Sequence, residues 1–387
     1  MTTRPKALVF GLLARMPLAG IAWQTLHYLE GLRRCGWEAY YVEDCWDWPY
    51  DAERNEFTED PAFTVGYFER VMGWAGFGDR WVFRGPTREV CGMPASEYER
   101  LLCDADALIN LSGGTELLDE HLRVPARIYL ETDPVLTQIG LALGHEHAWE
   151  AMRAHTHHFT FAENYGAPDC EMPVVDVHYQ PTRQPVVIDW WQSEAGDDDA
   201  PFSTVATWNQ AGDKDVEWNG RQLMWSKHEQ FLKFLDLPKL SGQRIELALT
   251  TGDPEVPNML RGKGWSVTNA FALSQDIHTY RDYIQAARGE FSVAKGQVVH
   301  VRSGWFSDRS ACYLAAGKPV VLQATAFERV LPTGRGLFAF SNMDEAVAAM
   351  GHIQADYDAN SVAATEIARE YFAAEKVVGS VLERSGL

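Results

Sequence analysis

The apolar and polar positions of the first 45 residues follow a strand, helix, strand order. The run 6–13 is short and almost wholly apolar, which is typical of a strand buried on both faces of a parallel sheet. Apolar residues then recur at helical spacing through 20–35, and Gly36 ends that predicted helix. A second predicted strand follows at 38–44. A unit of this length predicts a right-handed crossover between parallel strands.

The rest of the first half continues with buried strands. Further apolar runs predict strands at 106–110, 126–134 and 157–164. The Trp- and Gly-rich stretch 46–95 is expected to hold helices and loops, and this half of the chain ends near 181–187. We therefore predict one doubly wound unit in the first half.

The same succession of elements begins again after residue 201. Strands are predicted at 202–208, 244–251, 265–270, 291–295 and 318–323, and helices at 224–237, 278–287, 307–317 and from about 343 onward. No residue-level repeat relates the two halves. The likeness between them is one of architecture only.

These patterns predict an α/β protein of two doubly wound, Rossmann-like domains that face each other across a cleft. The expected boundaries are an N-terminal domain at 1–188, an acidic linker at 189–201, a C-terminal domain at 202–360, and a C-terminal helix at 361–387 that can pack back on the N-terminal domain. Ligands of open α/β sheets bind beyond the carboxyl ends of the strands. We expect the site to lie in that cleft.

Charge narrows the choice of partners. The 387 residues contain 34 Lys and Arg against 54 Asp and Glu, a net charge of −20. Such a surface repels phosphate backbones and anionic lipid, so we expect no nucleic acid partner. No run approaches the ~20 apolar residues of a membrane span. Six scattered cysteines without a CxxC are typical of reduced thiols, which predicts a cytoplasmic protein without a thiolate metal site.

The segment 301–321 contains the strongest candidate for an anion site. A short polar loop leads into a predicted helix whose first turn contains Ser307, Asp308, Arg309 and Ser310. Helix N-termini present unpaired N–H groups and partial positive charge, which suit a phosphate. The alternative is a plain N-cap without a ligand.

The loop, helix and strand ending in LAAGKPVV (314–321), with the following 325–340, resemble the donor-site segment of GT-B glycosyltransferases, including an uncharacterised bacterial subgroup. The resemblance implies that the C-terminal domain binds a UDP-, GDP- or dTDP-sugar donor. The N-terminal domain would bind a small-molecule or glycan acceptor. It also implies no metal and no cofactor beyond the nucleotide-sugar co-substrate. The donor contacts that it implies in this segment are Arg302, Ser303, Gly304, Trp305, Phe306, Ser307, Asp308, Arg309 and Ser310.

One pair of positions departs from that family. Many retaining members carry two glutamates eight positions apart, and this chain has Gly304 and Cys312 there. The departure leaves open whether the transfer would retain or invert the anomeric configuration.

Other donor contacts are expected where loops follow strands. Gly20 ends the loop 15–20 after the first strand, and Trp208 begins a loop after the first strand of the second half. A basic residue near the next helix contacts the diphosphate in the family, which points to Lys227. Lys295, just after Glu290, would balance phosphate charge. The alternatives are a plain turn at Gly20, a solvated Lys227, and a surface ion pair for Lys295.

A transfer that inverts configuration needs a base within reach of the acceptor hydroxyl. Asp133 and Glu131 lie at the carboxyl end of a predicted strand, and Glu163 lies at another. Asp133 precedes a proline, so its alternative role is to cap a turn. We expect Asp133 or Glu131 to be the catalytic base.

Five histidines lie close together at His145, His147, His155, His157 and His158. Their spacing matches no zinc or iron signature, so we predict a structural or acceptor-contact role and no metal. Trp46, Trp48, Trp190, Trp191 and Trp208 can stack on sugar or aglycone rings or pack in the core.

The leading hypothesis is a metal-independent glycosyltransferase that uses a nucleotide sugar. One alternative is an epimerase or hydrolase acting on nucleotide sugars on the same fold. Another is a GT-B-like binding subunit that has no catalytic activity, which the two missing glutamates favour.

Overall fold

The computed structural model describes residues 4–193, 198–209 and 214–387. Parts of two predicted segments, the linker 189–201 and the loop 207–212, lie outside the described residues.

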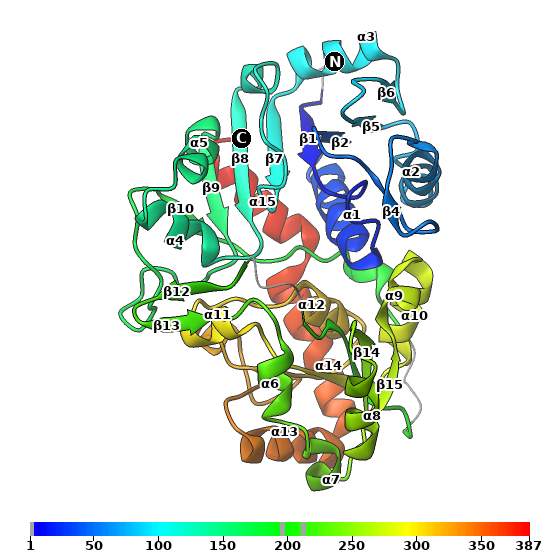
Figure 1. Cartoon of the computed structure of the whole chain (residues 1–387), viewed down its shortest axis with the longest axis vertical. Coiled ribbons are helices and arrows are strands. Elements are labelled where there is room, and N and C mark those ends of the chain that lie inside the picture. Colours follow the sequence, from blue (N-terminus) through cyan, green and yellow to red (C-terminus); the bar gives the residue numbers. More distant parts are fainter. Residues whose placement is uncertain (1–3, 194–197, 210–213) are drawn as a thin grey trace.

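An eight-stranded sheet forms the centre of the first half (Figure 1). Its strands are β1 (Lys6–Phe10), β2 (Glu38–Asp44), β5 (Trp81–Arg84), β6 (Val90–Cys91), β7 (Ala107–Leu111), β8 (Ala126–Glu131), β9 (His157–Thr160) and β10 (Tyr179–Pro181). They lie in the order β10-β9-β8-β7-β1-β2-β5-β6, and every pair is parallel except β5 with β6. The predicted strands of this half are confirmed.

Helices cover both faces of this sheet. They are α1 (Ala19–Arg34), α2 (Ala62–Trp74), α3 (Ala95–Asp104), α4 (Leu136–Ala142) and α5 (Glu146–Ala154), with short 3₁₀ turns at His121–Arg123 and Ile188–Trp190. A small hairpin of β3 (Tyr50–Asp51) and β4 (Glu56–Phe57) lies between β2 and α2. Gly36 has a φ of 89° just after α1, the left-handed conformation that ends a helix without steric cost in glycine.

A six-stranded, wholly parallel sheet forms the second half. Its strands are β11 (Phe202–Thr207), β14 (Ile245–Thr250), β15 (Ser266–Asn269), β16 (Gly289–Ser292), β17 (Val320–Gln323) and β18 (Leu337–Phe340). A separate hairpin pairs β12 (Val216–Trp218) with β13 (Arg221–Leu223). The helices are α6 (His228–Leu232), α7 (Leu237–Ser241), α8 (Glu255–Gly262), α9 (Ala270–Ser274), α10 (Ile277–Ala286), α11 (Gly296–His300), α12 (Asp308–Ala315), α13 (Met343–Ala355), α14 (Tyr357–Ile367) and α15 (Ala374–Arg384).

Both sheets have the same winding. The second sheet runs β15-β14-β11-β16-β17-β18, so its first strand lies in the middle and the connections turn outward in both directions from it. In the first sheet β1 has the same position, between β2 and β7. This is the doubly wound arrangement, and its ligand sites lie beyond the central strands. The predicted α/β class with two Rossmann-like domains is confirmed.

The last helix returns to the first half. In Figure 1, α15 (red) rises from the lower domain into the upper one, and it packs along α1. A Cβ added to Gly31 of α1 would come within 2.6 Å of Val378 on α15, so this glycine permits close approach. Ala373 also bridges to Val186, and Arg384 donates to the carbonyl oxygen of Pro181 at 2.8 Å. The C-terminal segment therefore joins the two domains.

Two local predictions were wrong. Of the segment 224–237, expected to form one helix, only α6 is helical before α7 begins at Leu237; Pro238, which lacks an N–H, is tolerated in the first turn of α7 but not inside a longer helix. The stretch 46–95, expected to hold helices and loops, also contains the strands β3 to β6. Gly20, where the predicted loop 15–20 meets the predicted helix 20–35, lies in the first turn of α1. None of the described helices has the length and apolar composition needed to cross a membrane.

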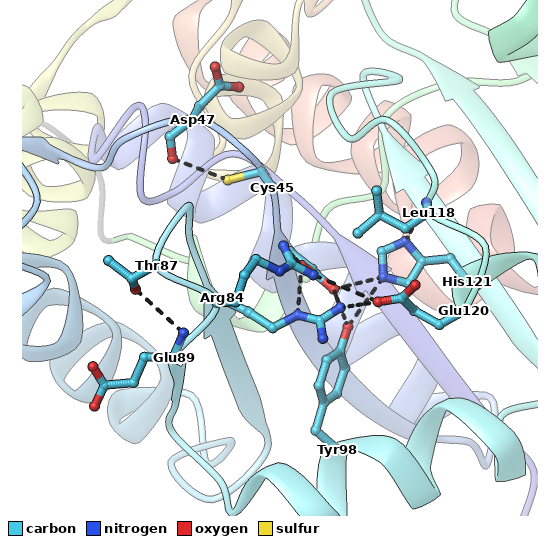
Figure 2. Close-up of polar contacts among 11 residues, drawn as sticks. Cys45, Asp47, Arg84, Thr87, Glu89, Tyr98, Leu118, Glu120 and His121 are labelled. Carbon is cyan, nitrogen blue, oxygen red and sulfur yellow. Dashed lines mark hydrogen bonds and ion pairs between the residues drawn. The ribbon is translucent and has the colours of Figure 1, made fainter.

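A buried polar cluster lies at the carboxyl ends of β2 and β5 (Figure 2). Asp44 is fully buried and is bound by Arg84, by Arg88 at 2.9 Å, by Tyr98 at 2.9 Å and by His121 at 2.8 Å. Burial alone would raise the pKa of Asp44, but the hydrogen bonds from His121 and Arg84 outweigh it and hold the pKa well below its usual range. We call these five residues the Asp44 cluster.

Candidate functional site

Two adjoining cavities lie between the domains. The larger cavity measures about 440 Å³ and the smaller about 250 Å³. Gly20, Ile21, Tyr280 and Arg309 line both. Both cavities lie beyond the carboxyl ends of the central strands, where open α/β sheets bind ligands.

The larger cavity is mainly apolar and has walls from both domains. Met16, Leu18 and Phe57 line it from the N-terminal half. Val205 and Phe271 face them from the second half, at the ends of β11 and β15. Such a cavity can hold a flat apolar group such as a nucleobase.

The smaller cavity gathers charged side chains from four separate segments. Asp133 follows β8, and Lys295 follows β16 and caps α11. Lys227 caps α6, and Asp308 is the first residue of α12. Two carboxylates and two lysines therefore line one small volume.

The two lysines have different surroundings. The Lys295 ammonium donates to Asp133 Oδ1 at 2.6 Å and lies 3.2 Å from the centre of the Trp225 ring. Lys227 is half-buried, and within the described part of the chain it has no ion-pair partner. Burial lowers the pKa of Lys227, and the neighbouring charges of Arg309 and Lys295 lower it further. The charges of Glu290 and Asp133 oppose this shift, but among the described residues neither carboxylate forms an ion pair with Lys227.

The N-terminus of α12 faces the same cavity. Ser307 occupies its cap position without a side-chain hydrogen bond to the helix. Asp308 accepts a hydrogen bond from the Gln24 amide of α1 at 3.1 Å. Burial raises the pKa of Asp308 to about 7; the Gln24 hydrogen bond opposes that shift, whereas the nearby charge of Asp133 adds to it.

Arg309 is bound within its own domain. Its guanidinium donates to Glu290 Oε1 at 2.7 Å, to the carbonyl oxygen of Val205 at 2.6 Å and to Ser292 Oγ at 2.9 Å. Glu290 is fully buried, so it neutralises the charge of Arg309 locally. Arg309 forms part of the cavity wall, and it brings less free positive charge to the cavity than Lys227 does.

The structure brings together about half of the residues that the sequence singled out. The smaller cavity is lined by Gly20, Asp133, Lys227, Lys295, Trp305, Ser307, Asp308 and Arg309. Neither cavity is lined by Glu131, Trp208, Arg302, Ser303, Gly304, Phe306 or Ser310.

The residues outside the cavities have structural contacts instead. Trp208 stacks on Phe231 in the core of the second domain, with ring centres 5.9 Å apart. Phe306 stacks on Phe372. Arg302 pairs with Asp169 at 2.8 Å. Ser303 and Ser310 are fully buried.

Glu131 is also removed from the cavities. Its carboxylate is buried and accepts from Thr160 Oγ1 and from Gln138 Nε2, each at 2.6 Å. Burial raises the pKa of Glu131 to about 7, although these hydrogen bonds favour the ionised form. Of the two carboxylates named as the base, only Asp133 reaches the cavity.

Gly304 shows why one expected glutamate is absent. Its φ is 82°, and an added Cβ would lie 2.4 Å from the backbone nitrogen of Asn164 in the first domain. Asn164 in turn donates from its backbone to the carbonyl oxygen of Ser303 at 3.0 Å. A side chain at position 304 would therefore separate the two domains.

The sequence analysis missed several lining residues. Ser112 and Thr132 directly follow β7 and β8, and their hydroxyl oxygens lie 2.6 Å apart. Their place after predicted buried strands was a usable signal. Gln24 and Tyr280 lie within helices and reach the cavity only through the docking of the domains, so no local pattern marked them.

Of the five histidines, His145 and His147 are exposed, and the other three form ordinary structural contacts. His155 lies 2.7 Å from the carbonyl oxygen of Ala151 and 3.2 Å from the Asn110 amide. His158 lies 2.9 Å from the carbonyl oxygen of Met152. Over residues 4–193, 198–209 and 214–387, no three His, Cys, Asp or Glu side chains lie together in a way that could hold a metal ion.

Several solved structures are similar to this chain over nearly its whole length. AviGT4, a glycosyltransferase of avilamycin A biosynthesis, has a TM-score of 0.55 at 14% identity, and the match covers 99% of this chain and 97% of AviGT4. An α-glucosyltransferase in complex with UDP and DNA reaches a TM-score of 0.61 at 10% identity, with complete coverage of both chains. The chain has the GT-B fold.

A third GT-B structure, Anabaena HepE in complex with UDP and glucose, has a TM-score of 0.52 at 12% identity and covers 99% of this chain and 100% of HepE. No protein-family model and no curated protein sequence matches the chain. The resemblance noted in the sequence is thus confirmed at the level of the fold.

The expectation that nucleic acid is excluded as a partner was wrong. An α-glucosyltransferase with the same fold is bound to DNA and UDP or UDP-glucose in several structures. The net charge of −20 averages over the entire surface, whereas binding depends on the local charge at the site. Net charge therefore does not decide the class of acceptor for this fold.

Proposed function

We propose that this protein is a glycosyltransferase that uses a nucleotide-sugar donor and requires no metal ion. The proposal rests on the division of the cleft between the domains into two cavities. A larger apolar cavity adjoins a smaller one that is lined by Lys227, which has no ion-pair partner among the described residues. A nucleotide sugar has the matching division into a flat nucleoside and a charged diphosphate. The GT-B fold supports the same assignment by analogy.

In this proposal the nucleoside occupies the larger cavity, and the diphosphate lies in the smaller one. The Lys227 ammonium and the N–H groups at the start of α12 would neutralise the diphosphate and its departing charge. Preorganised donors of this kind stabilise a leaving anion in the role that a metal ion fills elsewhere. Lys295 would add a second positive charge beside the diphosphate while it stays bound to Asp133.

We further propose Asp133 as the base. Its carboxylate would accept the proton of the acceptor hydroxyl as that oxygen bonds to the anomeric carbon. The bond between that carbon and the diphosphate would break at the same time, and the electron pair would leave with the nucleotide. The hydrogen bond from the Lys295 ammonium to Asp133 Oδ1, 2.6 Å long, fixes the orientation of this carboxylate.

The acceptor would lie on the N-terminal domain beside the mouth of the larger cavity. Three large aromatic side chains near that edge are exposed: Trp46 at 58%, Trp48 at 37% and Phe57 at 62%. Exposed aromatics in one segment can stack on a ring of the acceptor. We therefore propose an acceptor that presents a flat ring face.

Donor binding is the direct test of the proposal. Titration calorimetry with UDP-, GDP- and dTDP-sugars would identify the donor, and Lys227→Met should weaken its binding tenfold or more, because a charge-assisted bond contributes about 1.5–3 kcal/mol. Lys239→Met is the matched control, because Lys239 is exposed on α7 and lines neither cavity. Equal donor affinity in the two variants would reject the placement of the diphosphate.

Turnover is tested separately. Asp133→Asn should abolish transfer to an acceptor and leave the donor affinity within a few-fold of the wild-type value. A protein that binds the donor but neither transfers nor hydrolyses it would instead be a binding subunit. The absence of both family glutamates, at Gly304 and Cys312, favours that second candidate.

A further inference from the structure

An acidic side chain stands where the proposed function requires a phosphate-binding surface. Asp308 is the first residue of α12 and lines the smaller cavity with Lys227 and Lys295. An ionised carboxylate there would repel the diphosphate that this cavity is proposed to hold. The inference below rests on that proposed function.

The groups in contact with Asp308 offer little positive charge to balance both an ionised carboxylate and a bound diphosphate. From α1, the Gln24 amide donates to Asp308 Oδ1, and the buried Tyr28 hydroxyl lies close by. Asp133 faces it from the end of β8. Tyr280 of α10, and Arg309 and Cys312 of α12, are further titratable neighbours. Lys227, Lys295 and His27 line the same cavity.

Among the described residues, no cation of the cavity forms an ion pair with Asp308: Lys295 is bound to Asp133, Lys227 does not contact Asp308 in an ion pair, and Arg309 is already neutralised. The Arg309 guanidinium is bound to the buried Glu290 at 2.7 Å. The Tyr28 hydroxyl has no hydrogen-bond partner among the described residues, so it can donate but brings no charge. A diphosphate beside Asp308 therefore meets a carboxylate whose anionic form has little local support.

We propose that Asp308 binds the donor diphosphate as a neutral carboxylic acid, so that each donor bound takes up one proton from solvent. One carboxyl oxygen accepts the hydrogen bond from the Gln24 amide. The other carries the proton and donates it in an O–H···O hydrogen bond to a phosphate oxygen. A hydrogen bond to an ionised acceptor is shorter and stronger than one between neutral groups, and protonation also removes the repulsion between like charges.

Burial favours the neutral form of Asp308, because it raises the pKa of this carboxyl to about 7 in the unliganded protein. A bound dianion raises that pKa further. Between the two values the protein must take up a proton in order to bind, so the dissociation constant rises by up to about tenfold for each pH unit above neutrality. Below neutrality Asp308 is already protonated, and the affinity should not depend on pH through this group.

The test is to count the protons taken up on binding. The nucleotide sugar selected by the donor screen is titrated calorimetrically at about pH 8 in two buffers of different ionisation enthalpy. A nucleotide sugar is the right probe, because its diphosphate is esterified at both ends and does not titrate near neutrality. Wild-type protein should take up close to one proton per donor more than Asp308→Asn does. Any uptake by Lys227 and Lys295, whose pKa values are lowered by burial, is common to both proteins and cancels from this difference.

Glu131→Gln is the matched control. Glu131 has a pKa raised to about 7 by burial like that of Asp308, but it lines neither cavity. Its replacement should leave the proton uptake at the wild-type value. Above neutral pH the dissociation constant of wild-type protein should also rise more steeply with pH than that of Asp308→Asn, by up to about tenfold per pH unit.

The outcomes separate this inference from the proposed function. Donor binding without proton uptake by the wild-type protein, or with equal uptake by Asp308→Asn, overturns the role of Asp308 and leaves the transferase proposal intact. If no nucleotide sugar binds to the wild-type protein at any pH, the proposed donor site itself fails, and this inference fails with it.

Discussion

The Asp44 cluster and the smaller cavity both gather charged side chains at strand ends, but they satisfy those charges differently. In the cluster, Asp44 is bound by two arginines, a histidine and a tyrosine. Figure 2 labels three of these partners, Arg84, Tyr98 and His121. The His121 Nδ1 atom accepts from the backbone of Leu118 at 3.1 Å, so Nε2 carries the proton that Asp44 receives. Each of these contacts lies within one domain.

In the smaller cavity Lys295 is paired with Asp133 and Arg309 with Glu290, but within the described part of the chain two other charged groups lack such partners. Lys227 has no ion-pair partner among the described residues, and Asp308 accepts a single side-chain hydrogen bond, from Gln24 in the other domain. A satisfied buried network stabilises one arrangement of the fold. Unsatisfied charges in a cavity instead leave binding capacity for a ligand. The comparison predicts opposite responses of the two regions to substitution.

The largest effect is expected in the cluster. Asp44→Asn should lower the free energy of unfolding by about 3–5 kcal/mol, because it leaves Arg84 without its buried counter-charge. Asp308→Asn should change that free energy by less than about 1 kcal/mol at neutral pH. Denaturant unfolding of the two variants measures the difference, and equal losses would contradict the distinction between the regions.

A pH-dependent effect of intermediate size is expected at Glu131. The folded state holds its proton up to about pH 7, well above the unfolded pKa near 4.5, so wild-type stability falls as the pH rises between these values. Glu131→Gln removes that loss. Its stability relative to wild type should therefore increase by about 1–3 kcal/mol from pH 5 to pH 8, as measured by denaturant unfolding.

The other carboxyl groups whose pKa is raised are present in both proteins. Their contributions therefore cancel from the difference in unfolding free energy between Glu131→Gln and wild type. A constant difference between Glu131→Gln and wild type over that pH range would show that Glu131 is already ionised at pH 5.

A smaller effect of opposite sign to Asp44→Asn is expected at Lys227. Lys227→Met keeps the apolar stem and removes a half-buried cation, so it should raise the free energy of unfolding by about 0.5–2 kcal/mol. The same variant should lose donor affinity. Thermal unfolding without ligand gives the first quantity, and a loss of stability there would mean that Lys227 has a structural partner.

The smallest effect is expected at the rim of the Asp44 cluster. The Glu120 side chain is 34% exposed and pairs with Arg84 at 2.5 Å. Solvent screens such a pair, so Glu120→Gln should cost about 0.2–1 kcal/mol of unfolding free energy. Comparison with Asp44→Asn in the same assay would show whether the inner carboxylate dominates the cluster.

Local sequence patterns were sufficient for most of the fold. The strand predicted at 38–44 is β2 itself, and the helix predicted at 20–35 differs from α1 by one residue at each end. Each of these elements buries one continuous apolar run or stripe, so the pattern of its own residues is enough to predict it. The helix predicted at 224–237 was wrong, because Pro238 fits only in the first turn of a helix, and α7 therefore begins separately from α6.

The residues of the candidate site could be predicted from local sequence patterns only in part. Asp308 and Ser307 were recognisable as the start of a helix that follows a polar loop. The burial of Glu131 and the packing of Trp208 against Phe231 were not recognisable, because the same residue types at strand ends face either a cavity or the core. Which of the two occurs depends on neighbours that are distant in the sequence.

The order of strands and helices, and with it the doubly wound fold, therefore follows from the amino-acid sequence read locally, because each element has its own hydrophobic period. The set of residues that line the cavity does not follow from local sequence patterns. Lys295 meets Asp133 across 162 positions of the chain, and Gln24 meets Asp308 across 284. Such pairs exist only after the two domains dock, because docking is set by packing over the whole interface rather than by any single segment.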